Sequence, residues 1–485
     1  MTQTPILVGA AQLEQRIEDP SAGKEPVELM IDAVRQAAED AGAPGLLARA
    51  GSVRVIRGLW PYHNPAAAVA DAVGCPGAET VLTPYGGNFV QTVVNRTALD
   101  IQNGVQDLVI ITGAECGNTQ AKARRAGLEL EWQPLPGKPD RMIGEDKDMR
   151  HQAEKMLRIG APIQIYPLFE NALRHHRGEN IDDHLVRISE LWAGFSRVAA
   201  ENPHAWLREP RTAEEIRTIS ASNRPVSFPY PKLMNSNNNV DQGAALIMCS
   251  TERARALGIP EEKWVYPWAG TDAHDHFHVS NRDNLYSSPA IRIAGGRALE
   301  LAGLTPADLS LVDVYSCFPV AVQVAAEEIG LDVGKPLTIT GGLTFHGGPL
   351  NNYVMHAIAR AVELLREQRE AKCLITANGG YLTKHAFGVY AATPPGAPFR
   401  HEDLQPEVDA TPRREVVLDY EGEASVESYT VMYGAEGPNI AHVVCRTPDG
   451  ARAWANCEDA AVMHAMTREE FCGRPVRVGE HRAHF

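Results

Sequence analysis

Short apolar runs alternate with longer amphipathic segments in the first quarter of the chain. The apolar runs have the length of buried strands and fall at 5–10, 52–56, 80–82 and 108–113. Segments with the period of a helix lie between them, at 25–41, Pro65–Val73 and Phe89–Gln102. This alternation of strands with helices predicts a largely parallel sheet that is covered by helices.

The same alternation returns in the second half of the chain. Helices are expected at 289–302, Pro319–Ile329 and 353–365, and strands at 311–315, 373–380 and 387–392. In each half one helix follows a Gly-Gly turn, Gly86-Gly87-Asn88 in the first and the stretch 341–352 in the second. The free N–H groups of such a helix end favour negative charge, and glycines let a ligand approach the backbone. One pattern used twice predicts a duplicated α/β fold that brings two equivalent helix ends together.

Two further segments depart from this rhythm. The segment 117–235 has helical signals at 167–174, at 182–200 and at a capping box that starts at Thr212, so we expect an insertion that covers the sheet ends. Strand character returns at 240–249. The acidic, Pro-rich stretch 394–412 predicts a linker, and alternation at 424–432, 439–446 and 451–455 predicts a small β domain of the OB type. The predicted division is 1–250 with the insertion, 251–396 as the second half and 413–485 as the β domain.

Composition limits the partners and the compartment. The chain has 485 residues and a formal net charge of −15, which argues against nucleic acid or an anionic membrane as the main partner. No apolar run is long enough to cross a bilayer, and the start of the sequence has no signal-peptide pattern, so we expect a cytoplasmic protein without a membrane span. The eight cysteines lack paired spacing, which predicts neither disulfides nor a zinc ribbon.

Four stretches resemble one known family: the strand Asp241-Gln242-Gly243-Ala244-Ala245, and residues 313–318, 341–349 and 377–380. They are similar to the thiolase superfamily, and within it to sterol-carrier-type thiolases and thiolase-like proteins with an additional C-terminal domain. The resemblance implies a five-layer αβαβα core of two halves, usually assembled as homodimers. It also implies an acyl-coenzyme A partner, with coenzyme A as substrate or ligand and no tightly bound cofactor. The β domain is a candidate module for a partner protein.

The catalytic motifs of that family are changed here. The position of its nucleophilic cysteine falls at Gly87 or Asn88, and its Asn-Glu-Ala-Phe motif corresponds to residues 315–318, where only the Phe is kept. Gly348 replaces the histidine of its Gly-His-Pro motif, and Ala377 replaces the cysteine of its Cys-x-Gly motif. The resemblance therefore excludes thiolysis through an acyl-cysteine, unless Cys317 or Cys116 has taken over; the alternative for both is a small core residue.

Other polar residues are expected near the floor of such a pocket. The candidates for proton transfer are Tyr315, His346, Tyr381 and His385. The candidates for ligand binding are Gly87, Asn88, Gly347, Gly348, Asn352 and Lys384. Helix ends beside a Tyr or His suit an enolate or oxyanion. For each side chain the alternative is a packed or hydrogen-bonded structural role.

Each of two clusters has both a structural and a functional interpretation. His274, His276 and His278 would share one face if they lay on a strand and could then bind a metal, but a polar loop is the default expectation. Lys122, Arg124 and Arg125 are expected to form a solvated face, with an anionic ligand as the alternative.

Three hypotheses about function follow. The first is acyl transfer or Claisen-type chemistry on a coenzyme A thioester without the cysteine. The second is a retro-aldol lyase, which in the resembling enzymes also lacks the cysteine and uses tyrosines; Tyr315 and Tyr381 are then the distinguishing residues. The third is a protein that binds coenzyme A or a partner without catalysis.

Overall fold

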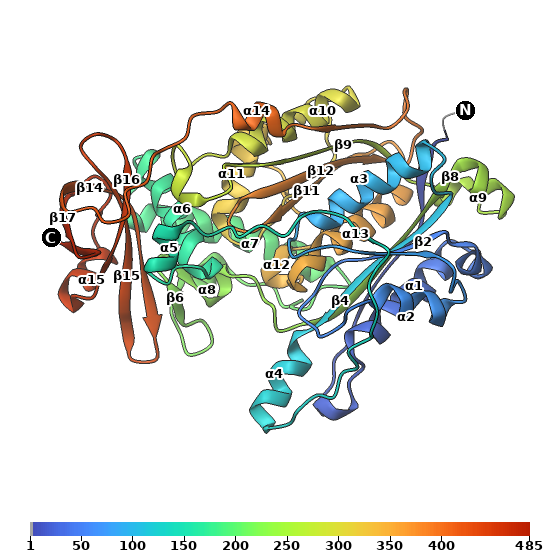
Figure 1. The fold of residues 1–485 in the computed structure, drawn as a ribbon, viewed down its shortest axis with the longest axis horizontal. Coiled ribbons are helices and arrows are strands. Elements are labelled where there is room, and N and C mark those ends of the chain that lie inside the picture. Colours follow the sequence, from blue (N-terminus) through green and yellow to red (C-terminus); the bar gives the residue numbers. More distant parts are fainter. Residues whose placement is uncertain (1–2) are drawn as a thin grey trace.

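Two sheets with helices between and around them form the core, and a β-barrel is attached at one end (Figure 1). The computed structural model describes residues 3–485. The strands of the first sheet are, in spatial order, β1 (Pro5–Glu14), β8 (Asp241–Ser250), β4 (Leu108–Cys116), β2 (Ser52–Val55), β3 (Glu79–Leu82) and β5 (Arg141–Met142). Those of the second are β10 (Leu311–Asp313), β11 (Lys372–Gly379), β12 (Lys384–Ala391), β9 (Tyr266–His274) and β13 (Arg400–Asp403).

The two sheets repeat one plan. In the first, β1 and β8 are antiparallel, β8 and β4 are antiparallel, and β4 and β2 are parallel. In the second, β9, β12, β11 and β10 follow the same order and the same directions. The predicted duplication is therefore confirmed.

Helices form the other layers. Helix α3 (Phe89–Gln102) and helix α13 (Tyr353–Glu367) each contact strands of both sheets, and both are buried on most of their surface. Helices α1 (Pro26–Asp40) and α2 (Pro65–Val73) cover the outer face of the first sheet. The outer face of the second is covered by α11 (Pro319–Ile329), α10 (Gly296–Ala302) and the π-helix η6 (Ile291–Gly295). The five-layer αβαβα core is thus observed, with α3 and α13 as its central layer.

The insertion contains mainly helices. They are α4 (Gly117–Ala126), α5 (Gln152–Met156), α6 (Pro162–His176), α7 (Ile181–Glu201) and α8 (Ala213–Arg217). Helix α6 begins five residues before the predicted Pro167, because a second proline, Pro162, occupies its first turn. Short strands β6 (Pro225–Ser227) and β7 (Tyr230–Pro231) join the sheet of the C-terminal domain, and α9 (Thr251–Ala256) follows β8. No helix in residues 3–485 combines the length and the apolar character that a membrane span requires.

The C-terminal strands close a barrel. Its strands are β14 (Gly422–Gly434), β15 (Gly437–Arg446), β16 (Arg452–Cys457), β17 (Pro475–Gly479) and β18 (Arg482–His484), with α15 (Ala460–Met466) between β16 and β17. Pairing runs β14–β15–β16–β18–β17 and returns to β14, so the ring is complete. A closed five-stranded barrel is compatible with the OB type, which remains a prediction.

The expected linker at 394–412 is wrong in part. Residues 400–403 form β13, which pairs in parallel with β9, and α14 (Gln405–Asp409) follows it. Pro and acidic residues suggested a free segment, but an edge strand tolerates both, since one side of it faces solvent.

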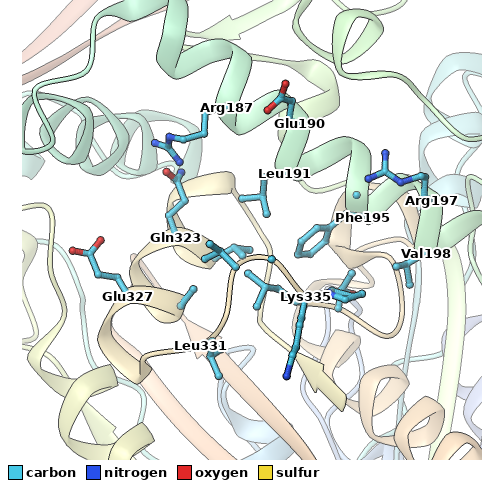
Figure 2. Close-up of a pocket in the computed structure, with 18 of the residues that line it drawn as sticks. Arg187, Glu190, Leu191, Phe195, Arg197, Val198, Gln323, Glu327, Leu331 and Lys335 are labelled. Atoms are coloured by element: carbon cyan, nitrogen blue, oxygen red, sulfur yellow. The ribbon is translucent and has the colours of Figure 1, made fainter. Parts of the chain in front are cut away.

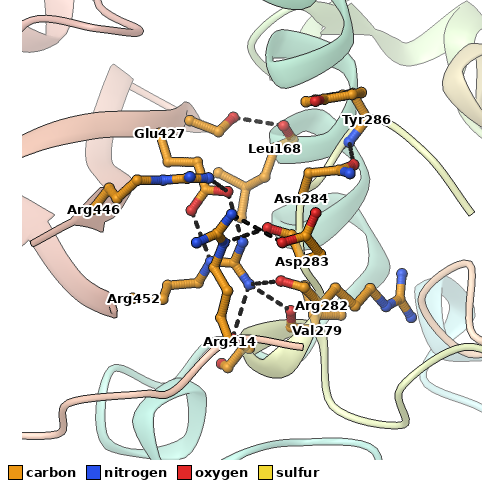
Figure 3. A network of polar contacts seen from close by, with 12 residues as sticks. Leu168, Val279, Arg282, Asp283, Asn284, Tyr286, Arg414, Glu427, Arg446 and Arg452 are labelled. Atoms are coloured by element: carbon orange, nitrogen blue, oxygen red, sulfur yellow. Dashed lines mark hydrogen bonds and ion pairs between the residues drawn. The ribbon is translucent and has the colours of Figure 1, made fainter. Parts of the chain in front are cut away.

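A buried ion pair fastens the barrel to the core (Figure 3). The fully buried guanidinium of Arg452 forms two hydrogen bonds with Glu427, of 2.8 and 2.6 Å. Its remaining nitrogen donates to the carbonyl oxygens of Val279, Ser280 and Arg282 in the loop after β9, at 3.3, 2.8 and 2.6 Å. Arg452 is thus paired with Glu427 inside the barrel and bonded through one nitrogen to the core, so a buried charge joins the two parts.

Candidate functional site

The Tyr315 hydroxyl occupies the space beside the N-terminus of α3. A methyl group added to Gly87 would lie 2.6 Å from Tyr315 Oη and 2.5 Å from the carbonyl oxygen of Asn378. Both distances are too short for a real side chain. Tyr315 follows β10 in the opposite half of the core, so the two halves meet at this point. The hydroxyl thus takes the place that a side chain at position 87 would fill.

Three buried polar atoms around this point lack a hydrogen-bond partner within residues 3–485: Asn88 Oδ1, Asn378 Oδ1 and His385 Nε2. A methyl group on Gly379 would lie 2.4 Å from Asn88 Oδ1, so Asn88 faces the end of β11. Buried polar groups are nearly always paired, and a cluster of unpaired ones is typical of a binding or catalytic site.

A void of about 10 Å³ lies between Tyr315, Asn378, Leu382 and His385. It has room for about one water molecule. Burial raises the pKa of Tyr315, so its phenol stays protonated at neutral pH. The structure therefore brings Tyr315 and His385 together around one small void.

A buried carboxylate lies close to His385. Its Nε2 lies 3.6 Å from Asp275 Oδ2, and the same carboxylate accepts hydrogen bonds from Ser288 Oγ at 2.5 Å and from the Ala290 N–H at 3.1 Å. Burial alone would raise the pKa of Asp275, but His385 and the charge of Arg282 lower it overall. Asp275 was not predicted, because the motif around it indicated only alternating histidines.

Lys384 places an amine next to Gly86. A methyl group on Gly86 would lie 2.7 Å from its Nζ, which donates a hydrogen bond of 2.7 Å to the Tyr85 carbonyl and lies 4.9 Å from the centre of the Phe89 ring. Burial lowers the pKa of Lys384 to about 8. Residues 384 and 385 belong to strand β12, which begins three residues earlier than expected. An amine that titrates near neutral pH therefore lies beside the start of α3.

Tyr381 points to the insertion. Its hydroxyl donates a hydrogen bond of 2.5 Å to the carbonyl oxygen of Gly160, whereas the Tyr166 hydroxyl of α6 accepts hydrogen bonds of 2.9 Å from Asn378 Nδ2 and the Leu382 N–H. Tyr166 positions Asn378. No motif in the sequence marks Tyr166, since it lies inside an ordinary apolar helix.

The cysteines are ordinary core residues by their surroundings. Burial raises the pKa of the Cys317 thiol to about 12 and also raises that of Cys116. The Cys317 sulfur receives a contact of 3.7 Å from Asn378 Nδ2. Neither thiol is activated as a thiolate at neutral pH.

The second helix end has a different set of groups. Residues 342–345 form the short helix α12 (Gly342–Phe345), and the 3-10 turn η8 (Leu350–Asn352) leads into α13. His346 is buried, its ring centre lies 5.2 Å from that of His356, and burial lowers the pKa of His346 to about 3. Its Nε2 also lacks a partner within residues 3–485. His346 is thus a neutral imidazole in a packed cluster.

Glycines and an amide complete this second end. A methyl group on Gly348 would meet Asn238 Oδ1 at 3.1 Å, and one on Gly347 would meet Gln242 Oε1 at 2.5 Å. Asn352 Nδ2 donates a hydrogen bond of 2.7 Å to the Gly113 carbonyl of β4, so it fastens η8 to the first sheet. These three positions therefore have structural contacts, and their role in ligand binding remains a prediction.

The Tyr353 ring lies between the two ends. Its centre is 5.6 Å from the ring centre of Tyr315 and 6.0 Å from that of His346. The hydroxyl of Tyr353 donates to the buried carboxylate of Asp313 at 2.8 Å. The predicted residues thus form two groups, one around Gly87 and one around His346, with Tyr381 outside both.

Within residues 3–485, the side chains of the histidine cluster do not converge on one point, and neither do those of the basic cluster. Strand β9 ends at His274, and the rings of His276 and His278 contact different neighbours, the Thr411 carbonyl and the ring of His151. Lys122 bonds the carbonyl of Ile17, and Arg124 and Arg125 are exposed on α4. The polar-loop interpretation fits the histidines.

The duplicated five-layer core defines a protein of the thiolase fold. A model of the thiolase-like protein type 1 additional C-terminal domain matches residues 403–482, and a thiolase C-terminal domain model matches 271–335. The solved monomeric SCP2-thiolase-like protein type 1 of Mycobacterium smegmatis is 33% identical, with a TM-score of 0.83, over 100% of this chain and 98% of its own. The chain belongs to this family of thiolase-like proteins type 1.

More distant relatives include enzymes with named activities. A steroid side-chain-cleaving aldolase of Thermomonospora curvata is 25% identical over 58% of this chain and 71% of its own length. An acetyl-CoA acetyltransferase of Methanocaldococcus jannaschii is 27% identical, over 49% of this chain and 53% of its own length. The solved Ltp2–ChsH2(DUF35) aldolase has a TM-score of 0.60 at 20% identity, over 80% of this chain and 97% of its own, which shows the shared fold.

Proposed function

We propose that this chain breaks or forms a carbon–carbon bond beside a coenzyme A thioester, as a lyase of the retro-aldol type without an acyl-cysteine intermediate. The observation that carries the proposal is the Tyr315 hydroxyl, which lies 2.6 Å from the methyl position of Gly87 at the start of α3. A proton donor there replaces a nucleophile. The aldolase relative supports this choice.

The environments of two groups assign their roles. Burial raises the pKa of Tyr315 and lowers that of Lys384 to about 8, so the phenol suits an acid and the amine a base. Lys384 would take the proton of the substrate's β-hydroxyl. The Cα–Cβ bond then breaks, a carbonyl compound leaves, and the electron pair passes to the thioester as an enolate. The N–H groups at the start of α3 stabilise this charge, and Tyr315 gives its proton to Cα.

This sequence of steps balances without a redox partner. The hydroxyl proton ends on Lys384 and the α-carbon gains the proton of Tyr315; exchange with solvent then removes the proton from Lys384 and restores that of the phenol. His385 lines the void beside Tyr315, and Asp275 lies behind His385. The ligand class, coenzyme A, follows from the family and is part of the proposal.

Claisen-type acyl transfer is the second candidate, since one relative is an acetyl-CoA acetyltransferase. A version with a covalent acyl-enzyme would need a nucleophile, and the Cys317 sulfur lies 3.7 Å from Asn378 Nδ2. Its raised pKa argues against this role. A mass increase on Cys317 after incubation with acetyl-coenzyme A would favour transfer over the lyase.

The test is Tyr315→Phe. With a panel of 3-hydroxyacyl-coenzyme A thioesters, we expect cleavage to fall roughly 10²- to 10⁴-fold, which is the usual contribution of a general acid. Coenzyme A binding by calorimetry should stay unchanged, because the ring remains. The matched control is Tyr266→Phe, at a buried tyrosine of β9 outside the site. Equal cleavage by Tyr315→Phe and the wild type would refute the lyase assignment; binding without any cleavage would favour a binding protein.

A further inference from the structure

A groove of about 910 Å³ lies between α7, α11 and the loop 331–338 (Figure 2). Leu191 and Phe195 of α7, Val322 of α11, and Leu331 and Leu337 of the loop give it an apolar lining. Its volume is within the range of small-molecule sites. Helix α11 lies between it and the void at Tyr315, because Val322 lines the groove and Ala321 and Ala325 line the void.

Gly194 lines this groove in the middle of α7, a helix of 21 residues. Glycine weakens a helix interior, so a packing constraint usually explains it. Here a methyl group would meet only Arg197 Nη2, at 3.7 Å, which is an ordinary contact. No protein atom therefore requires glycine at this position. Gly194 therefore leaves the backbone of α7 open to a molecule that lies in the groove.

The charges around the groove balance. The cations are Arg177, Arg187, Arg197 and Lys335. The carboxylates are Glu179, Glu190, Glu201 and Glu327. Two pairs are already formed, Arg177 with Glu327 at 2.8 Å and Arg187 with Glu179 at 2.8 Å. Equal numbers of both signs disfavour a strongly charged peptide or nucleotide and favour an uncharged apolar body.

The inner wall of the groove reaches the segment after the candidate site. A methyl group on Gly342 would lie 2.6 Å from the Phe195 ring on one side and 2.6 Å from Ser316 Oγ on the other. Ser316 is the neighbour of Tyr315. Only the Phe195 ring and one glycine thus separate the groove from the strand end that carries the tyrosine.

We propose that this groove is a binding site for a neutral, largely apolar small molecule that packs against α7 at Gly194. The site is independent of the thioester chemistry proposed above. A rigid polycyclic body and a flexible alkyl chain share the required chemistry, and competition distinguishes them.

The experiment titrates the full chain with Nile red, a neutral apolar fluorophore. We expect one bound molecule for each wild-type chain and at least a tenfold weaker Kd for Gly194→Leu, whose side chain projects into the groove where the molecule would contact α7. The matched control is Gly296→Leu in α10, where an added side chain also meets no atom within 4 Å, outside the groove; it should bind as the wild type does. Displacement by phenanthrene or by dodecanol then identifies the preferred shape.

Two results would overturn the proposal. One is a wild-type chain that does not bind Nile red, and the other is equal binding by the wild type and Gly194→Leu. If Gly194→Leu fails to fold, Val198→Trp fills the groove from the next turn of α7 and tests the same point. Neither readout uses turnover, so the outcome does not depend on the lyase assignment.

Discussion

The two helix ends that the duplicated core brings together now differ in chemistry. At the start of α3, a phenol and an amine have pKa values displaced in opposite directions, and a void of about 10 Å³ adjoins the phenol. Around α12 and α13, burial lowers the pKa values of His346 and His356, so both imidazoles are neutral. Both ends contain buried atoms without partners in residues 3–485, but only the first has groups suited to moving a proton near neutral pH.

This difference indicates that the two helix ends of the duplicated fold have different roles. By the resemblance of its motifs, the position of the thiolase nucleophile falls at Gly87 or Asn88 and that of the motif histidine at Gly348. At the first, Tyr315 fills the vacated space from the opposite half. At the second, Asn238 Oδ1 and the side chain of Leu343 lie nearest, at 3.1 and 3.5 Å from a methyl position. The first end thus has an acid, Tyr315, in this space, whereas the second end has only packing contacts at Gly348.

The largest expected effect concerns Lys384. Lys384→Met should lower turnover roughly 10²- to 10⁴-fold, since it removes the proposed base. In the wild type, kcat/KM should rise with pH through about 8, because the amine must lose its proton to act and its pKa is lowered to about 8. A pH–rate profile of the wild type and of Lys384→Met measures this.

Two controls make the result specific. Lys384→Arg keeps the positive charge but cannot lose its proton in this range, so it should be as inactive as Lys384→Met. Lys372→Met, on β11 beside the Trp268 ring, should keep the wild-type profile. A rising limb near pH 8 that persists in Lys384→Met would assign that limb to another group.

A smaller effect compares the two glycines directly. Gly87→Ala places a methyl group 2.5 Å from a backbone carbonyl and should cost about 1–3 kcal/mol of the free energy of unfolding. Gly348→Ala meets its neighbours at 3.1 Å and beyond, so its cost should stay below about 1 kcal/mol. Urea unfolding of both variants measures the difference. Equal losses would mean that the two ends are packed alike.

Much of the core could be predicted from the sequence, because its elements have strong local signals. The ranges of α2, α3 and α11 agree with prediction, since each helix has clear apolar periodicity and a proline or Gly-Gly turn at its start. Strand β9 and the barrel strands β17 and β18 were missed. Strand β9 lacks alternation and pairs with strands distant in the chain, whereas β17 and β18 are only five and three residues long.

The sequence predicted which residues belong to the candidate site but not how they are arranged in space. Motif comparison selected Gly87, Tyr315 and His385, which do lie together. It could not separate His346 from this group, because the position of a side chain two residues from a motif depends on the turn. Asp275 and Tyr166 act through tertiary contacts alone, which no local pattern of residues reports.

The smallest effect tests the second end through its stability at acid pH. The pKa of His346 is about 3 in the folded chain, against about 6.5 when unfolded. The contribution of His346 to the free energy of unfolding is therefore complete above pH 6.5. It is lost as the pH falls towards 3, because only the unfolded chain then takes up the proton. Between pH 6.5 and 5.5 this group should lower the free energy of unfolding by about 1 kcal/mol.

The charged and titratable groups that act on His346 are His204, Glu363 and Arg360, with His356 in ring contact. His346→Gln removes the proton site, so its unfolding free energy should change less with pH over this interval than that of the wild type. An unchanged slope would mean that His346 takes up a proton while folded, and the second end would then have an imidazole that titrates and could share in proton transfer with the first.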